Sequence, residues 1–114
     1  MVIEQKELLV RAVKAGPAGH IVVIGIPNNG KSIHVGDIFT TRYDVFQTVE
    51  HILAELPRPI PTNHAEIALT VITIDSMRHQ ISELPHGVTG ALHLAGTGLE
   101  MITPNCFLLT GASK

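Results

Sequence analysis

Short runs of β-branched and aliphatic residues recur along this 114-residue chain, and most of these runs end at or near glycine, proline or asparagine. Valine, isoleucine and threonine pack well on a pleated sheet, whereas glycine, proline and asparagine favour the turns between strands. The length is that of one domain, residues 1–114. The pattern therefore predicts a mainly β domain.

The sequence predicts five or more short strands. The segments are the second half of 3–14, then 20–26, 32–43, 66–75, 88–96, 97–104 and 105–111. The glycines and prolines of 15–19 and 85–87 predict turns, and 79–87 is interpreted as a connection. Many short strands in one small domain favour a small closed or nearly closed β-barrel.

Local turn chemistry suggests how two of these strands are joined. Asn29-Gly30 is the strongest two-residue hairpin signal, because a type I′ turn needs positive φ at both central positions. It predicts a hairpin between 20–26 and 32–43, with a further turn or bulge at Val-Gly-Asp (35–37).

One segment has a helical rather than a β pattern. Residues 44–56 carry apolar side chains at three- and four-residue spacing after Asp44, a plausible N-cap, and the prolines of 57–61 end the pattern. The sequence predicts one short inserted helix here, which either caps a barrel mouth or contributes to a homo-oligomer interface.

Residues 25–32, GIPNNGKS, match the phosphate-loop pattern G-x-x-x-x-G-K-[ST]. In a nucleotide-binding protein the loop between Gly25 and Gly30 would cradle phosphates with its backbone N–H groups. Lys31 would reach the terminal phosphates, and Ser32 would bind Mg²⁺. These four residues form the candidate ligand site of a nucleotide-binding alternative.

The surroundings of the motif favour the hairpin instead. A phosphate loop needs a helix that begins at the Gly-Lys-Ser, but IHVGDIFTT (33–41) has no helical apolar period. The chain is also short for the several βαβ units of a nucleotide-hydrolase sheet.

Two stretches resemble the second domain of elongation factor Tu and of other translational GTPases. Residues 19–39 resemble its opening strand, short turn and I-x-V-G-D step, and residues 67–102 resemble its later strands and glycine turn. The matching residues are Gly36, Asp37, Leu69–Ile74, Gly87, Gly90, Leu92, Leu94, Gly96 and Ile102. The likeness covers about residues 8–103; segment 44–64 is longer and more helical than the family's connection.

The resemblance implies a β-barrel whose glycines mark tight bends and bulges, where a Cβ would clash. In that family the domain docks on the GTPase domain and helps to hold the aminoacylated end of tRNA. It therefore implies a binding module related to translation, with a protein or RNA partner. No contact residue of the family maps onto this chain.

The net charge and the composition of the chain limit the classes of partner that it can bind. Eight Lys+Arg against 10 Asp+Glu give a net charge of −2, which argues against a DNA-binding face. The basic residues are dispersed, without interleaved aromatics; they include Arg11, Lys14, Arg42, Arg58 and Arg78. An RNA footprint is therefore not visible locally.

Seven histidines suggest a third alternative, a small histidine-dependent metal protein. However, no pair has ligand spacing on a single element, and the hairpin register would place His34 opposite Gly25. Asp75, Glu83 and Glu100 are interpreted as solvated loop carboxylates. The single Cys106 excludes an intramolecular disulfide and is expected to be buried.

The leading hypothesis is a non-enzymatic binding or interaction module that needs no cofactor, metal or catalytic residue. An unknown protein or RNA partner and a homo-oligomer are both compatible with it. No stretch reaches ~18 uninterrupted apolar residues, and MVIEQKELL (1–9) lacks the features of a signal peptide, so we expect no membrane association and a cytoplasmic location.

Overall fold

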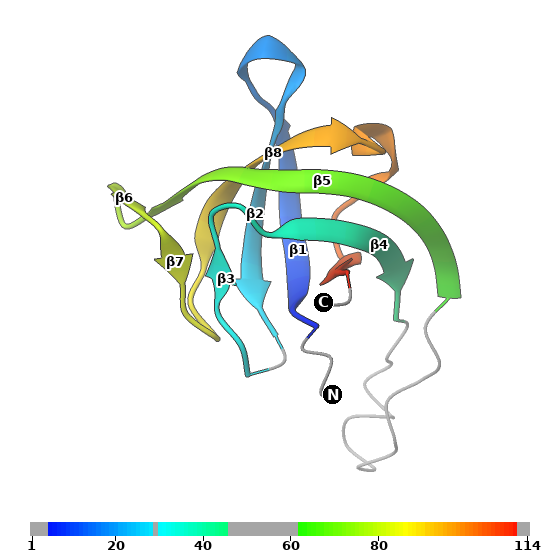
Figure 1. Ribbon diagram of the computed structural model, residues 1–114, viewed down its shortest axis with the longest axis horizontal. Coiled ribbons are helices and arrows are strands. Elements are labelled where there is room, and N and C mark those ends of the chain that lie inside the picture. Colours follow the sequence, from blue (N-terminus) through cyan, green and yellow to red (C-terminus); the bar gives the residue numbers. More distant parts are fainter. Residues whose placement is uncertain (1–4, 29, 46–61, 112–114) are drawn as a thin grey trace.

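The computed structural model describes residues 5–28, 30–45 and 62–111, which form nine strands and two short 3-10 turns (Figure 1). In chain order these are β1 (Glu7–Ala15), η1 (Pro17–Gly19), β2 (Ile21–Pro27), β3 (Ile33–His34), β4 (Ile38–Asp44), β5 (Thr62–Ser76), β6 (His79–Ile81), β7 (Glu83–Leu84), β8 (Gly90–Thr97), η2 (Leu99–Met101) and β9 (Phe107–Thr110). The predicted mainly β fold is confirmed.

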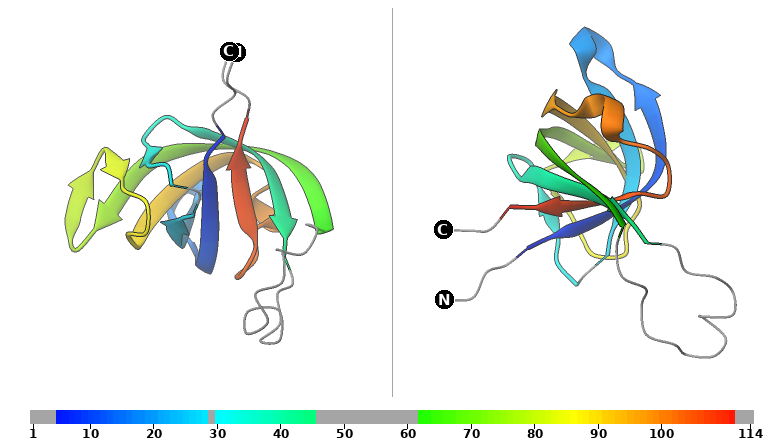
Figure 2. Two further views of the ribbon diagram at one scale, coloured as in Figure 1. Left: turned by 90° about the horizontal axis from the view of Figure 1, so that it is seen from below. Right: turned by 90° about the vertical axis from the view of Figure 1, so that its right-hand side faces the viewer.

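Six strands close into an antiparallel barrel. The main sheet has the order β4-β9-β1-β2-β8-β5-β6, and β4 also pairs with β5, which closes the ring. Figure 2 shows β1 and β9 side by side in this ring. β6 extends the sheet beyond β5, and β3 forms a small separate sheet with β7. Closure pairs the edges that an open sheet would leave exposed.

Alternation along the strands places the core inside the barrel. On β5, Leu69 and Val71 point inward, but the next buried residue is Ile74 rather than residue 73. The shift arises because the β5–β8 register slips between Val71 and Thr73. Ile72, the extra residue of this bulge, is 41% exposed.

The core is aliphatic, as the scarcity of aromatic residues requires. Its fully buried members include Leu8, Val10, Val23, Leu92, Leu94, Leu108 and Phe39. Cys106 is also fully buried within this cluster, as predicted for a free thiol that behaves as a small apolar side chain.

Two glycines lie where an added side chain would meet a neighbouring group. Gly25 and Gly90 face each other across the β2–β8 pair. A Cβ at Gly25 would lie 2.9 Å from the carbonyl oxygen of Leu9, and one at Gly90 would lie 2.8 Å from the Leu84 side chain. Glycine at position 25 thus allows β1 and β2 to lie close together, and glycine at position 90 leaves room for the Leu84 side chain.

The predicted hairpin at Asn29-Gly30 is wrong. β2 pairs with β1 and β8, whereas β3 pairs with β7, so the strands on either side of Gly30 are not partners. His34 consequently lies opposite Glu83 rather than Gly25. The neighbours of β2 are set by strand pairing around the closed barrel and not by the local preference of Asn29-Gly30 for a tight turn.

Three further segments differ from the prediction. Residues 97–104 contain η2 instead of a strand, because Gly98 (φ 96°) turns the chain out of β8. The predicted connection 79–87 contains β6 and β7 before its turn. The predicted strand 32–43 divides into β3 and β4 at residues 35–37, where a turn or bulge is predicted.

The predicted helix over 44–56 lies largely outside the described residues. Asp44, its expected N-cap, is the last residue of β4 and binds Arg42. Residues 46–56 are not among those that the structure describes. In the described part of the chain, no helix has the length and apolar character needed to cross a membrane.

Candidate functional site

The turn between β3 and β4 is held by several hydrogen bonds and lies next to an open surface. The backbone N–H of Asp37 donates to the carbonyl of His34 at 3.1 Å, which closes a four-residue turn. Gly36 has φ 95° at the third position, as a type II turn requires. The carboxylate of Asp37 accepts a 2.7 Å bond from the N–H of His34, so both ends of the turn are joined twice.

Main-chain hydrogen bonds dock this turn on its neighbours. Gly36 N–H donates to the carbonyl of Val71, and Val71 N–H donates to that of Asp37, each at 2.9 Å. The N–H of Val35 donates to the Ser82 carbonyl at 3.0 Å. The turn is therefore fixed both to β5 and to the segment between β6 and β7.

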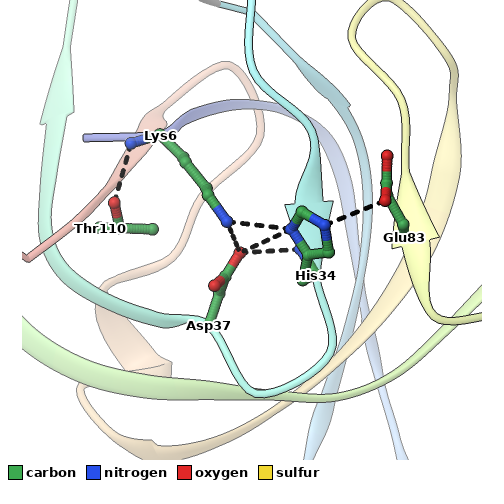
Figure 3. Close-up of polar contacts among 5 residues, drawn as sticks. All are labelled: Lys6, His34, Asp37, Glu83 and Thr110. Atoms are coloured by element: carbon green, nitrogen blue, oxygen red, sulfur yellow. Dashed lines mark hydrogen bonds and ion pairs between the residues drawn. The ribbon is translucent and has the colours of Figure 1, made fainter. Parts of the chain in front are cut away.

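A chain of polar side chains ties the same turn to β1 and β7 (Figure 3). Lys6 Nζ donates to Asp37 Oδ2 at 2.8 Å and contacts His34 Nδ1 at 3.0 Å. His34 Nε2 lies 3.0 Å from Glu83 Oε1. The N–H of Lys6 also donates to Thr110 Oγ1 at 2.8 Å.

The direction of these bonds follows from their chemistry. The ammonium of Lys6 can only donate, so Nδ1 of His34 accepts and Nε2 carries the hydrogen that is given to Glu83. Both ring nitrogens are thus occupied. This arrangement fixes the imidazole ring; it does not offer a free base to a substrate.

The main effect of this polar network is to hold the turn in place, and its contribution to the free energy of folding is small. The side chains of His34 and Glu83 are 47% and 51% exposed, and exposed ion pairs contribute about 0–1 kcal/mol. Its effect is to hold the turn that carries Val35 at one fixed place beside β6.

An open hollow of about 420 Å³ lies beside this turn. It is lined by Val35, Ile72, Thr73, Gln80, Ile81 and Ser82. Val35 and Ile72 are 42% and 41% exposed, and Ile81 is half-buried. The hollow thus combines three apolar side chains with three uncharged polar ones.

The topology explains why the surface is hollow at this point. Along one edge of β5, the β3–β4 turn bonds to Val71, and β6 begins its pairing at Ile74. Residues 72–73 lie between these two partners, where the β5–β8 bulge also falls. A break in strand pairing and a bulge therefore coincide, and the bulge exposes Ile72 on the surface.

Such a site suits one apolar side chain from a partner. Burying an aliphatic side chain against apolar surface contributes about 1.5–3 kcal/mol. Hydroxyl and amide groups at Thr73, Gln80 and Ser82 can hydrogen-bond a partner's backbone or fix its orientation.

The structure places the phosphate-loop residues in an unsuitable setting. Gly25 is buried in the middle of β2, and Gly30 is exposed with φ 82°. Lys31 and Ser32 precede β3, so a two-residue strand follows them where a phosphate loop needs a helix.

We expect nucleotide binding to be independent of Lys31. Titration calorimetry with ATP or GTP and Mg²⁺ should give the same absence of heat for the wild-type chain and for Lys31→Ala, because no helix N-terminus is present to bind phosphate. Measurable nucleotide binding that Lys31→Ala abolishes would contradict this interpretation.

The remaining titratable residues are dispersed. Among the described residues, no three His, Cys, Asp or Glu side chains come together in a way that could hold a metal ion. His93 Nε2 lies 3.3 Å from Asp75 Oδ2, and Glu83 is bound to His34. Glu100 is exposed on η2.

A buried polar cluster at the start of β1, next to Lys6 in the chain, was not predicted from the sequence. Glu7 is only 5% exposed and accepts hydrogen bonds from Asn28 Nδ2, at 2.8 Å, and from the Tyr43 hydroxyl. The Tyr43 ring stacks on Phe107 and on His64. The cluster joins β1, β4, β5 and β9, which indicates a structural role.

Comparison with protein-family models, with curated proteins and with solved structures found no match for this chain.

Proposed function

We propose that this chain is a non-enzymatic interaction module that holds an apolar side chain of a protein partner in the hollow between the β3–β4 turn and β6. The observation that carries the proposal is the hollow itself. The turn that carries Val35 is fixed by three main-chain bonds and a polar network, and Ile72 is exposed by a bulge. A rigid, exposed apolar site is typical of a recognition surface.

The chemistry of the lining favours a protein over a nucleic acid. None of the residues that line the hollow is charged or aromatic. Nucleic-acid sites need cations for phosphates and flat rings for bases, and the chain has a net charge of −2. A protein side chain is the ligand that matches this surface.

The resemblance to the second domain of elongation factor Tu supports the same proposal. In that family the barrel serves as a docking domain, and a closed barrel is the scaffold observed for this chain. A partner related to translation follows from that resemblance and belongs to the proposal, as does the cytoplasmic location expected from the sequence.

Selection of displayed peptides on the immobilised protein tests this function. We expect enriched peptides to share an aliphatic residue or methionine, and we expect Ile72→Glu to weaken their binding by about tenfold or more, because the carboxylate would lose hydration in an apolar hollow. Fluorescence anisotropy of one selected peptide measures the change.

Met101→Glu is the matched control. Met101 is 42% exposed, as Ile72 is 41% exposed, but it lies on η2, across the barrel from β6 (Figure 1). This variant should bind the peptide as the wild type does. Equal binding by Ile72→Glu and wild type, with both folded by circular dichroism, would contradict the proposed function.

A further inference from the structure

The turn between β5 and β6 presents a large apolar side chain to solvent. Ser76 and His79 form the last pair of the two strands, so Met77 and Arg78 are the two central residues of the turn. Met77 is 88% exposed, the highest value among the exposed large apolar side chains of the described residues.

The backbone of this turn is unusual for its sequence. Met77 has φ 52° and Arg78 has φ 67°, a geometry of type I′ turns in which Asn-Gly is preferred. The left-handed region costs a residue with a side chain roughly 1–2 kcal/mol. Strain of this kind often marks a position that serves a purpose other than stability.

The projecting methionine and the hollow belong to the same hairpin. The hollow lies at the hairpin's base, where Ile72 and Ile81 are found, and Met77 lies at its tip. Met77 lies five positions after Ile72 along the chain, a span of about 16 Å. Two such hairpins packed in opposite directions would bring each tip to the base of the other.

We propose that the partner of the hollow is a second copy of this chain, whose Met77 side chain occupies the hollow while its own hollow receives the first copy's Met77. The contact is two-fold symmetric, since each copy gives a methionine and receives one. Methionine is flexible and fits irregular apolar sites. This inference rests on the proposed function, because it uses the same hollow.

Charge supports a second copy as the occupant. The tip carries Arg78, which is exposed beside Met77. Acidic side chains flank the hollow: Asp75 pairs with Gln80 of its lining and is 46% exposed, and Glu83 follows Ser82 and is 51% exposed. A hairpin tip that enters the hollow therefore places its arginine near carboxylates.

The contact is small, which sets the expected affinity. We expect two packed hairpins to bury less than the roughly 1,200–2,000 Å² of a standard stable interface. We therefore expect a reversible dimer with a dissociation constant in the micromolar range or weaker.

Sedimentation equilibrium up to about 1 mM protein tests the dimer. We expect Met77→Glu to raise the dissociation constant by about tenfold or more, since the carboxylate cannot be buried in the hollow, and Met77→Leu to stay within about twofold of wild type. Met101→Glu, the control with a similar exposed side chain, should leave the dimer unchanged. A wild-type chain that is monomeric throughout, or a dimer that Met77→Glu leaves intact, overturns the inference.

The charged residue gives a second readout. Arg78→Glu should weaken the dimer by about threefold or more at low salt, because it would face Asp75 and Glu83 with a like charge, and Arg78→Lys should retain it. An Arg78→Glu chain that dimerises as tightly as wild type counts against this docking.

Peptide binding separates this inference from the proposed function. A chain that stays monomeric but binds the selected peptides through Ile72 overturns self-association alone. If the inference holds, those peptides dissociate the dimer, and Met77→Glu, whose hollow is intact, still binds them. A wild-type chain that neither binds selected peptides nor dimerises would overturn both this inference and the proposed function.

Discussion

Replacing Gly96 with alanine should destabilise the fold more than any other single-methyl addition at a glycine. An alanine Cβ at this position would lie 1.9 Å from the carbonyl oxygen of Ala68, and Gly96 has φ 141°. Gly96 pairs with Leu69 in the β5–β8 ladder, so backbone must move in the wall of the barrel. We expect a loss of about 3–5 kcal/mol in the free energy of unfolding, measured by urea denaturation.

The Gly87→Ala variant measures the cost of a left-handed backbone without a steric clash. It therefore separates the two effects that are combined at Gly96. Gly87 has φ 80°, but a Cβ there meets nothing within 4 Å. Only the left-handed backbone remains as a cost, so we expect a loss of about 1–2 kcal/mol. If both variants lost the same stability, close approach of β5 and β8 would not be the reason for glycine at position 96.

The strands could be predicted because their apolar residues mark one face of each strand. Gly90, Leu92 and Leu94 stand at every second position of segment 88–96, which places them on one face of a strand, and all three are buried on β8. The glycine requirement was also visible, because a β run interrupted by glycine indicates a close backbone approach. Both signals are local, so they can be recognised in the sequence alone, and together they predict a barrel.

Strand pairing was less predictable. Asn29-Gly30 favours a tight turn, but β2 has its two partners in β1 and β8, and no edge of it remains for β3. Local turn preference competes with the pairing of the whole ring, and closure of the ring involves many more hydrogen bonds.

The hollow could not be predicted, because it depends on contacts far apart in sequence. Lys6 and Asp37 are 31 residues apart, and His34 and Glu83 are 49 apart. One local signal was present: Val71 and Ile72 are consecutive apolar residues in an otherwise alternating run. A break in alternation can indicate a bulge, and here the bulge exposes Ile72.

The role of Arg42 in the fold could not be predicted from the sequence either. The sequence presents it as one of several dispersed cations, but in the barrel it is only 7% exposed. Its two terminal nitrogens contact both carboxylate oxygens of Asp44, at 3.3 and 3.2 Å. They also donate to the carbonyl of Asn63 at 3.0 Å and to Thr103 Oγ1 at 2.9 Å. One side chain thus joins the end of β4, the start of β5 and the loop before β9.

Replacing Arg42 with methionine should therefore cost about 2–4 kcal/mol in the free energy of unfolding, because a buried charge network loses its guanidinium and polar partners lose their donors. We expect the lower end of this range for two reasons. Asp44 is 21% exposed and keeps the Asn63 amide as a donor. Nε of Arg42 is buried with no hydrogen-bond partner among the described residues, so burial of this guanidinium already has a cost. Urea denaturation measures the loss.

Two further variants decide whether geometry or charge is responsible. Arg42→Lys keeps the charge but cannot reach Asp44, Asn63 and Thr103 together, so its stability should fall between those of wild type and Arg42→Met. Arg11→Met, at an exposed position of β1, should stay within about 0.5 kcal/mol of wild type. A lysine variant as stable as wild type would mean that charge alone suffices. An Arg42→Met variant as stable as Arg11→Met would mean that the three contacts add nothing beyond the cost of burying the guanidinium.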